Sequence, residues 1–348
     1  MTRTTRTILL ALALLAPLGG AAAQDHAAPA AAQKADSATV APAVAATQGA
    51  DTAQHAAAPA EKKKDYIMPH VLNSDHVYVP SLGHGFEREI ILPHWTPIHI
   101  GGLTIDLSPT KHVVMLVIAA TLLLAVMLTA ASGAKKARAE GRPASGIAGA
   151  IEAMVLYLRN DVILPNVGHH GEKYVPYCLS AFFLILFCNL LGLIPYMGTA
   201  TGNISVTATL AILSFLVVEF AGIRALGMGY INTIVWWPHD LPVLVKAPVT
   251  LIMTPVELLG KFTKPFALAM RLFANMTAGH IAVLALIGMV FTFAQLLSYS
   301  PVSYVAALIP VALSTAIMGL EVFVAFLQSF IFMLLTAVFI GQIRESHH

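Results

Sequence analysis

Five long apolar stretches dominate the later two-thirds of this sequence, and they constrain the fold more than any other feature. A membrane-spanning helix needs about 20 predominantly apolar residues. Only 11% of the 348 residues are charged, too few to cover the surface of a soluble protein of this size. The sequence therefore predicts an all-α polytopic membrane protein with about five transmembrane helices. In chain order the stretches are Val113–Ala131, Val175–Leu193, Ile204–Ile223, Val249–Leu297 and Val305–Ile340.

The last two stretches are much longer than the first three. As a single helix the fourth would be roughly 70 Å long, more than twice the ~30 Å hydrocarbon core of a bilayer. Pro255 and Pro265 offer this helix places to bend, because proline removes an amide donor and crowds the preceding turn. We expect the last two helices to be long, strongly tilted and arranged as a hairpin.

Lysine and arginine are distributed unevenly among the connections. Six of them lie between the first and second stretches, whereas residues 194–203 and 298–303 contain none. Positively charged loops stay in the cytoplasm, so we expect the amino end outside and the carboxyl end in the cytoplasm. Within the basic connection, residues 147–166 have apolar side chains at helical spacing, which predicts an amphipathic helix along the cytoplasmic face.

The chain before the first stretch falls into three parts. Residues 1–23 combine two arginines, a short apolar run and three alanines, the pattern of a secretory signal peptide; an uncleaved anchor helix is the alternative. Residues 24–64 are rich in alanine and proline, which predicts a disordered exported tail. In the extracytoplasmic segment 65–111, alternating apolar positions permit a small β-rich element. The membrane domain then comprises residues 112–348.

A single arginine, Arg271, stands in the fourth stretch with Phe, Leu, Ala and Met on both sides. A central arginine costs ~2.5 to 3.5 kcal/mol on insertion scales, so its presence indicates either a function or a structural pairing. Glu257 and Lys264 precede it at seven-residue spacing, which turns a helix through about 700° and places all three on one face. Asn275 continues this stripe, whereas His280 lies on the opposite face.

The fifth stretch carries its own polar pair, Glu321 and Gln328, also seven residues apart. Pairing between the two long helices is the economical way to satisfy polar groups at membrane depth. Glu257 and Lys264 lie on the cytoplasmic side of the arginine, and His280 and Glu321 on the external side. This layout predicts two half-channels separated by a fixed positive charge.

The segment RLFANM, which begins at Arg271, resembles the signature of subunit a of F-type ATP synthases. The resemblance extends over about Ile147–Gln342 and includes CNLLGLIP at 188–195, the NISVT run at 203–207 and LQSFIFMLLT at 327–336. Residues 24–100 have no counterpart in the family.

The resemblance implies a role for each matching residue. Arg271 takes the place of the essential stator arginine, Asn275 that of its neighbouring asparagine, and Gln328 that of the glutamine facing the arginine. His280 and Glu321 occupy the two external positions, where well-known bacterial members carry Glu and His, so the pair is interchanged as in the mitochondrial branch. Glu219, in the third stretch, is a further half-channel candidate, although an acid at a helix end is an equal alternative.

The resemblance also implies a function and partners. The chain would be the proton-translocating stator of the F0 sector in a bacterial inner membrane, facing a rotating c ring and bound to the subunit b stalk and the rest of the F1F0 complex. We expect no cofactor or metal. The net charge of +2 and the lack of a long basic block argue against nucleic acid as a partner. The sequence contains no Walker A motif, so nucleotide chemistry would reside in other subunits.

Two other classes compete with this interpretation. In a secondary transporter or ion channel, Arg271 would bind an anionic substrate, but residues 112–223 and 249–340 show no internal repeat. An intramembrane hydrolase would need a nucleophile with a base or a zinc motif, and neither HExxH nor G-x-S-x-G occurs.

Overall fold

The computed structural model describes the membrane domain and parts of the segment that precedes it. The signal peptide expected at 1–23 and the tail expected at 24–64 lie outside the described residues, so both stay predictions. The described residues are 76–80, 87–94, 98–100, 103–105, 108–168, 171–194, 198–233, 243–297 and 301–345.

Among these residues, five helices are long and apolar enough to cross a membrane, which confirms the expected number. Several run past the apolar stretch that predicts them, because a helix does not end where its side chains become polar. The helices are α3 (Lys111–Ala139), α6 (Val175–Gly192), α7 (Ile204–Leu226), α8 (Val243–Leu296) and α9 (Pro301–Glu345).

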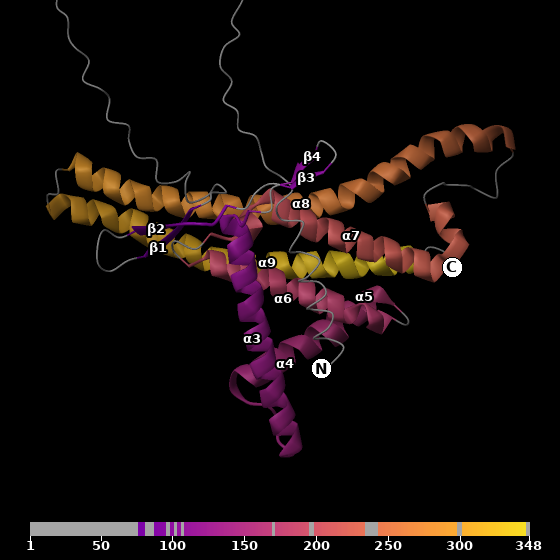
Figure 1. Cartoon of the computed structure of the whole chain (residues 1–348), viewed down its shortest axis with the longest axis horizontal. Helices are drawn as coiled ribbons and strands as arrows, with labels where there is room; N and C mark the ends of the chain where they lie inside the picture. The colour runs from indigo at the N-terminus through magenta and orange to yellow at the C-terminus, as the bar shows by residue number, and fades with distance from the viewer. Residues whose placement is uncertain are drawn as a thin grey trace, which may run out of the picture. The chain divides into compact units, whose positions relative to one another are not determined.

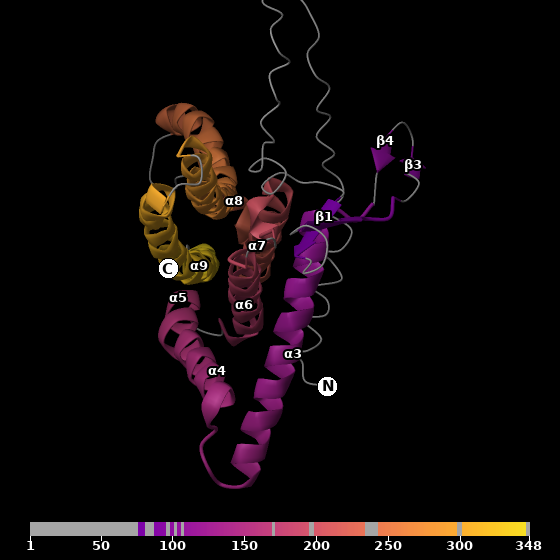
Figure 2. The same cartoon turned by 90° about the vertical axis from the view of Figure 1, so that its left-hand side faces the viewer.

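The last two helices form the expected hairpin. α8 has 54 residues and α9 has 45, and they pack against each other. Pro248, Pro255 and Pro265 all lie inside α8, which continues through them as one helix. Figure 1 shows α8 curving beside α9, with both running crosswise to α3. In Figure 2, α6 to α9 are viewed nearly end-on, whereas α3 is seen lengthwise. α6 and α7 therefore also run crosswise to α3.

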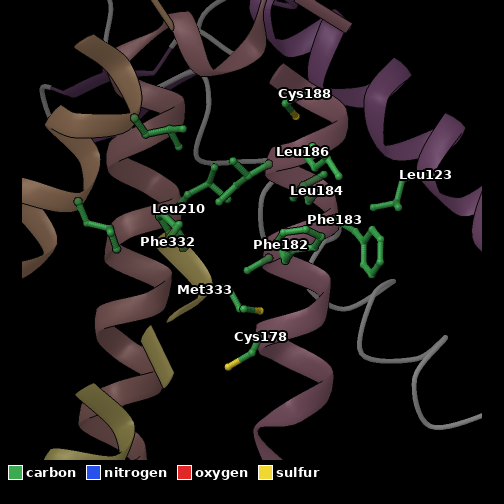
Figure 3. Close-up of a cluster of buried hydrophobic side chains, with 14 of the residues drawn as sticks. Leu123, Cys178, Phe182, Phe183, Leu184, Leu186, Cys188, Leu210, Phe332 and Met333 are labelled. Carbon is green, nitrogen blue, oxygen red and sulfur yellow. The ribbon is translucent and has the colours of Figure 1, made fainter. Parts of the chain in front are cut away.

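The core of the membrane domain is built around α6, which contacts α3 and α9. Its side chains are apolar on every face, and this predicts a buried position. Phe182 and Phe183 meet edge to face with ring centroids 5.0 Å apart, and both are buried. Figure 3 shows them among residues of α3, α7 and α9, including Phe332 and Met333. Cys178 and Cys188, also in this cluster, are unpaired and buried.

The range in which the sequence predicts an amphipathic helix is helical. It contains α4 (Gly146–Tyr157), a π-helical turn (Leu158–Ile163) and α5 (Leu164–Val167). α5 packs against the end of α9, where Arg344 Nη1 donates a hydrogen bond of 2.7 Å to the Val167 carbonyl. This contact fixes the carboxyl end of the hairpin. The location of the segment on the cytoplasmic face stays a prediction.

The expected β-rich element before α3 is also present in the described residues. β1 (His76–Pro80) pairs antiparallel with β2 (Glu87–Ile91), and β3 (Ile98–Ile100) pairs antiparallel with β4 (Leu103–Ile105). The two hairpins are short, so the all-α class describes the membrane-spanning part of the chain.

Candidate functional site

Arg271 projects from a face of α8 that the other described residues leave uncovered. The side chain is exposed, whereas Leu272 and Met276 on the other face are buried. Among the described residues, Arg271 forms no ion pair and no side-chain hydrogen bond. Structural pairing with another described residue therefore does not explain why this costly charge is retained.

The polar stripe on α8 is present as predicted. Because α8 continues as one helix through all four positions, the spacing of Glu257, Lys264, Arg271 and Asn275 places them on one face, and all four are exposed. The ammonium group of Lys264 lies 4.9 Å from the centroid of the Phe339 ring on α9. The stripe thus lies along the uncovered side of α8, beside the contact with α9.

Glu321 on α9 is buried against α8 at Gly279, next to His280. Its side chain is 8% exposed. A Cβ atom at Gly279 would overlap the Glu321 carboxylate and lie 3.0 Å from its Cδ. His280 is half-buried. The acid and the imidazole thus lie at neighbouring positions of the hairpin interface, and glycine is the residue that allows the acid to approach.

We expect Gly279→Ala to slow proton pumping by the assembled complex at least about tenfold, since displacing a reacting group by ~1 Å can cost about a hundredfold. The added methyl group would push the Glu321 carboxylate away from α8. Gly288→Ala is the matched control, because a Cβ there meets no atom within 4 Å. Pumping in inverted vesicles measures both variants, and equal rates would contradict the positioning role of Gly279.

Gln328 is buried on α9, with 6% of its surface exposed, and no hydrogen bond joins it to Arg271 among the described residues. The family resemblance implies that the two side chains face each other. Arg271 is exposed on α8 and Gln328 is buried on α9. That the two side chains face each other stays a prediction.

A chain of buried polar groups links α3, α6 and α9 near the connection between α6 and α7. The carbonyl of Thr199 accepts a hydrogen bond of 3.0 Å from His112 Nδ1, and the hydroxyls of Thr199 and Thr201 are 2.7 Å apart. Thr201 donates to Asn189 Oδ1 at 2.6 Å, and Asn189 Nδ2 donates to the Ala325 carbonyl at 3.4 Å. This network lies near the part of the hairpin that carries Glu321, because Gly202 of its 3₁₀ turn, Ala200–Gly202, approaches Thr277, two residues before Gly279.

Earlier along α8, ten residues before Arg271, Lys261 is paired with Glu219 of α7. The Lys261 ammonium lies 3.5 Å from Glu219 Oε2, and the two side chains are only 12% and 18% exposed. Lys261 also donates to Tyr230 Oη at 3.1 Å and to Thr233 Oγ1 at 3.2 Å. This group joins α7, the 3₁₀ turn after it and α8. Glu219 is therefore held in an ion pair, as well as being a half-channel candidate.

Lys261→Met should destabilise the complex by about 3 kcal/mol, the scale observed when one partner of a buried ion pair is removed. The loss should be smaller in a Lys261→Met/Glu219→Gln double variant, since no unpaired carboxylate is then left. Thermal dissociation in detergent measures the effect. Lys264→Met serves as the control because Lys264 is exposed and forms no ion pair with a described residue. Equal midpoints for the two single variants would refute a stabilising role for the ion pair.

Sequence reasoning did not single out Lys261, Lys111 or His112. Each had a weak signal: Lys261 lies three residues before Lys264 in an apolar stretch, and the other two directly precede the first stretch. Charged residues at the ends of spans are common, so position alone does not separate a buried group from one that reaches the headgroups.

The fold and site together define a class of protein: a polytopic α-helical membrane protein whose last two helices form a long hairpin. The hairpin presents an exposed arginine on α8, and further along it a buried acid of α9 lies next to a half-buried histidine of α8. The chain belongs to the ATP synthase A chain family, whose model matches residues 113–341. It is thereby a subunit of the F0 sector and part of the F1F0 complex.

Several relatives support the assignment over most of the chain. Matches that cover up to 85% of the chain include part of residues 24–100, so the expectation that this segment has no counterpart in the family is wrong for that part. ATP synthase subunit a 2 of Chlorobaculum tepidum is 44% identical over 294 residues, covering 84% of this chain and 76% of the relative. ATP synthase subunit a of Chloroherpeton thalassium is 45% identical over 262 residues, covering 75% and 73%. The subunit of Anaeromyxobacter dehalogenans is 40% identical over 306 residues, covering 85% and 74%.

Proposed function

We propose that this chain is the proton-translocating stator of the F0 sector, with Arg271 as its essential fixed charge. The observation that carries the proposal is the exposure of Arg271 on a membrane-spanning helix, without an ion pair among the described residues. A guanidinium in that position is held ready for an opposite charge that another subunit supplies.

The proposed partner on this face is the rotating c ring. Ala267, Ala274 and Ala278 are exposed around Arg271, and small residues let a second helix approach closely. Large apolar side chains extend the face along both helices, which suits a partner that is itself embedded in lipid. They include Val256 and Ile281 on α8 and Leu320, Phe323 and Leu327 on α9.

The arrangement accounts for proton transfer as follows. A carboxylic acid of the ring travels through lipid in its neutral form, because a bare carboxylate there is costly. Near Arg271 the opposite charge favours the carboxylate, so the proton leaves through one half-channel. The acid is then reprotonated from the other half-channel before it re-enters lipid. The fixed positive charge of Arg271 also prevents direct leakage of protons between the half-channels.

The two half-channels would use different residues. On the external side, His280 can exchange protons near neutral pH and Glu321 is buried close by. On the cytoplasmic side, Glu257 and Lys264 are exposed along the stripe, and Glu219 lies behind them in its pair with Lys261. Asn275, one turn beyond Arg271 on the same face, and Gln328 would orient the guanidinium when the ring is engaged.

The remaining features of the proposal concern placement and assembly. The proposed location is a bacterial inner membrane. The distribution of lysine and arginine favours the amino end outside and the carboxyl end in the cytoplasm. Subunit b would bind the stator from the stalk, and nucleotide chemistry would belong to other subunits. Membership of the ATP synthase A chain family favours this function over a secondary transporter that binds an anionic substrate at Arg271.

ATP-driven proton pumping in inverted vesicles tests the proposal, with Arg271 replaced and assembly of the complex verified by pull-down. Loss of pumping in an assembled complex supports the stator function, and wild-type pumping would refute it.

A further inference from the structure

The first turn of α3 carries two deeply buried basic side chains. Lys111 is 1% exposed and His112 is 2% exposed, although α3 as a whole presents many apolar side chains to its surroundings. Burying a charged basic group costs several kcal/mol unless an opposite charge or hydrogen bonds compensate for the lost hydration. Neither residue belongs to the stripe on α8 or to the pair on α9.

The hydrogen bond of His112 determines which ring nitrogen can take up a proton. Nδ1 lies 3.0 Å from the carbonyl oxygen of Thr199. A carbonyl oxygen can only accept, so Nδ1 carries a hydrogen and donates it. In the neutral ring the lone pair is then on Nε2. His112 is thereby held in the tautomer that can accept a proton at Nε2 while it keeps its hydrogen bond to the Thr199 carbonyl.

The contacts around His112 extend towards His280 and Glu321 on the hairpin. Thr199, the hydrogen-bond partner of His112, directly precedes the 3₁₀ turn Ala200–Gly202, which packs against α8. The 3₁₀ turn after Thr199 brings Gly202 to Thr277, whose Oγ1 would lie 4.0 Å from a Cβ at that glycine. Thr277 Oγ1 is buried and has no hydrogen-bond partner among the described residues. A buried hydroxyl of this kind is normally satisfied by water.

We propose that His112 is a proton-carrying residue at the external entrance of the outer half-channel. A proton from the external water binds the lone pair of Nε2 and makes an imidazolium, while the Nδ1 hydrogen stays on the Thr199 carbonyl. The Nε2 proton then passes, through water near Thr277, to His280 and on to the Glu321 carboxylate, and the neutral His112 ring is restored. This inference rests on the proposed stator function and extends its path from the hairpin to α3.

The test compares His112→Ala with His112→Gln in the whole complex. The glutamine amide can still donate to the Thr199 carbonyl but cannot carry a proton, whereas alanine leaves room for a small molecule. ATP synthesis is measured in proteoliposomes driven by a potassium diffusion potential, with and without imidazole. His99→Ala is the control, because His99 is exposed on β3. Pull-down verifies assembly of each variant.

We expect both His112 variants to synthesise ATP about tenfold more slowly than wild type, the low end of what a positioned proton-transfer group contributes. Imidazole should restore the alanine variant and leave the glutamine variant slow. The similarly sized but weakly basic 1,2,4-triazole should restore neither variant. His99→Ala should match wild type.

Other outcomes would overturn the proposal. A glutamine variant at the wild-type rate would make His112 a structural hydrogen-bond donor. Rescue of the alanine variant by triazole as well as imidazole would mean that the ring only fills space. A slow alanine variant that imidazole does not restore would equally exclude proton transfer at this position. An Arg271→Ala complex in the same assay distinguishes failure of the stator proposal from failure of the His112 proposal. If this complex synthesises ATP normally, the stator function itself is refuted.

Discussion

Replacement of Arg271 by alanine is expected to abolish ATP-driven proton pumping in a complex that still assembles. Arg271 forms no ion pair or side-chain hydrogen bond with a described residue, so its removal breaks no such contact within the chain. The ring carboxyl would pass the stator without the charge that favours loss of its proton. We expect pumping to fall at least about a hundredfold, the scale for removing one preorganised electrostatic group.

Arg271→Lys should fail as well, although it retains a positive charge at neutral pH. A lysine in an apolar interface can lose its proton, and its ammonium group lacks the planar fork of guanidinium. Arg159→Ala is the control because Arg159 is exposed and lies 3.5 Å from Glu172 in an exposed ion pair. Such a pair contributes only about 0–1 kcal/mol, so pumping should stay normal. Normal pumping by the assembled Arg271→Ala complex would instead show that the arginine has no role in transport.

The second large effect is expected for Glu321→Gln, which should slow pumping by about ten- to a hundredfold, the range for loss of a proton-transfer group. Glutamine preserves the size of the side chain that packs against Gly279, so the hairpin interface should remain intact. It cannot bind and release a proton in the physiological pH range. Glu321→Asp keeps the acid but shortens the side chain, and we expect an intermediate rate.

Ser314→Ala provides a matched control for this variant. Ser314 is also buried on α9, but its hydroxyl donates a 2.9 Å hydrogen bond to the Val311 carbonyl of the same helix. Removing it should leave pumping unchanged. Initial rates of acidification in inverted vesicles measure both variants. If Glu321→Gln pumps as fast as Ser314→Ala, the acid has no part in the external half-channel.

The number of spans and the stripe on α8 follow from the sequence because they depend on local properties. Apolar length predicts a spanning helix, and helical periodicity assigns Glu257, Lys264 and Arg271 to one face. The structure confirms both points. The ends of α3 and α8 could not be predicted as well from the sequence, since a helix continues into polar sequence wherever its backbone hydrogen bonds can still form.

Contacts between distant parts of the chain could not be predicted in the same way. The hydrogen bond from His112 to Thr199 joins residues 87 apart, and the ion pair between Lys261 and Glu219 joins residues 42 apart. Each depends on how whole helices cross and rotate against one another. Many packings satisfy the same apolar pattern, so the pattern alone does not select among them.

The sequence by itself determined that this is a five-span membrane protein with an arginine on a polar stripe, because hydrophobic length and periodicity are written into consecutive residues. Only the tertiary structure decided that Arg271 is exposed, that Gly279 admits Glu321, and that a buried histidine of α3 is hydrogen-bonded to Thr199, next to the turn that packs against α8. The physical reason is that burial and polar contacts between helices arise from packing, which no single helix specifies.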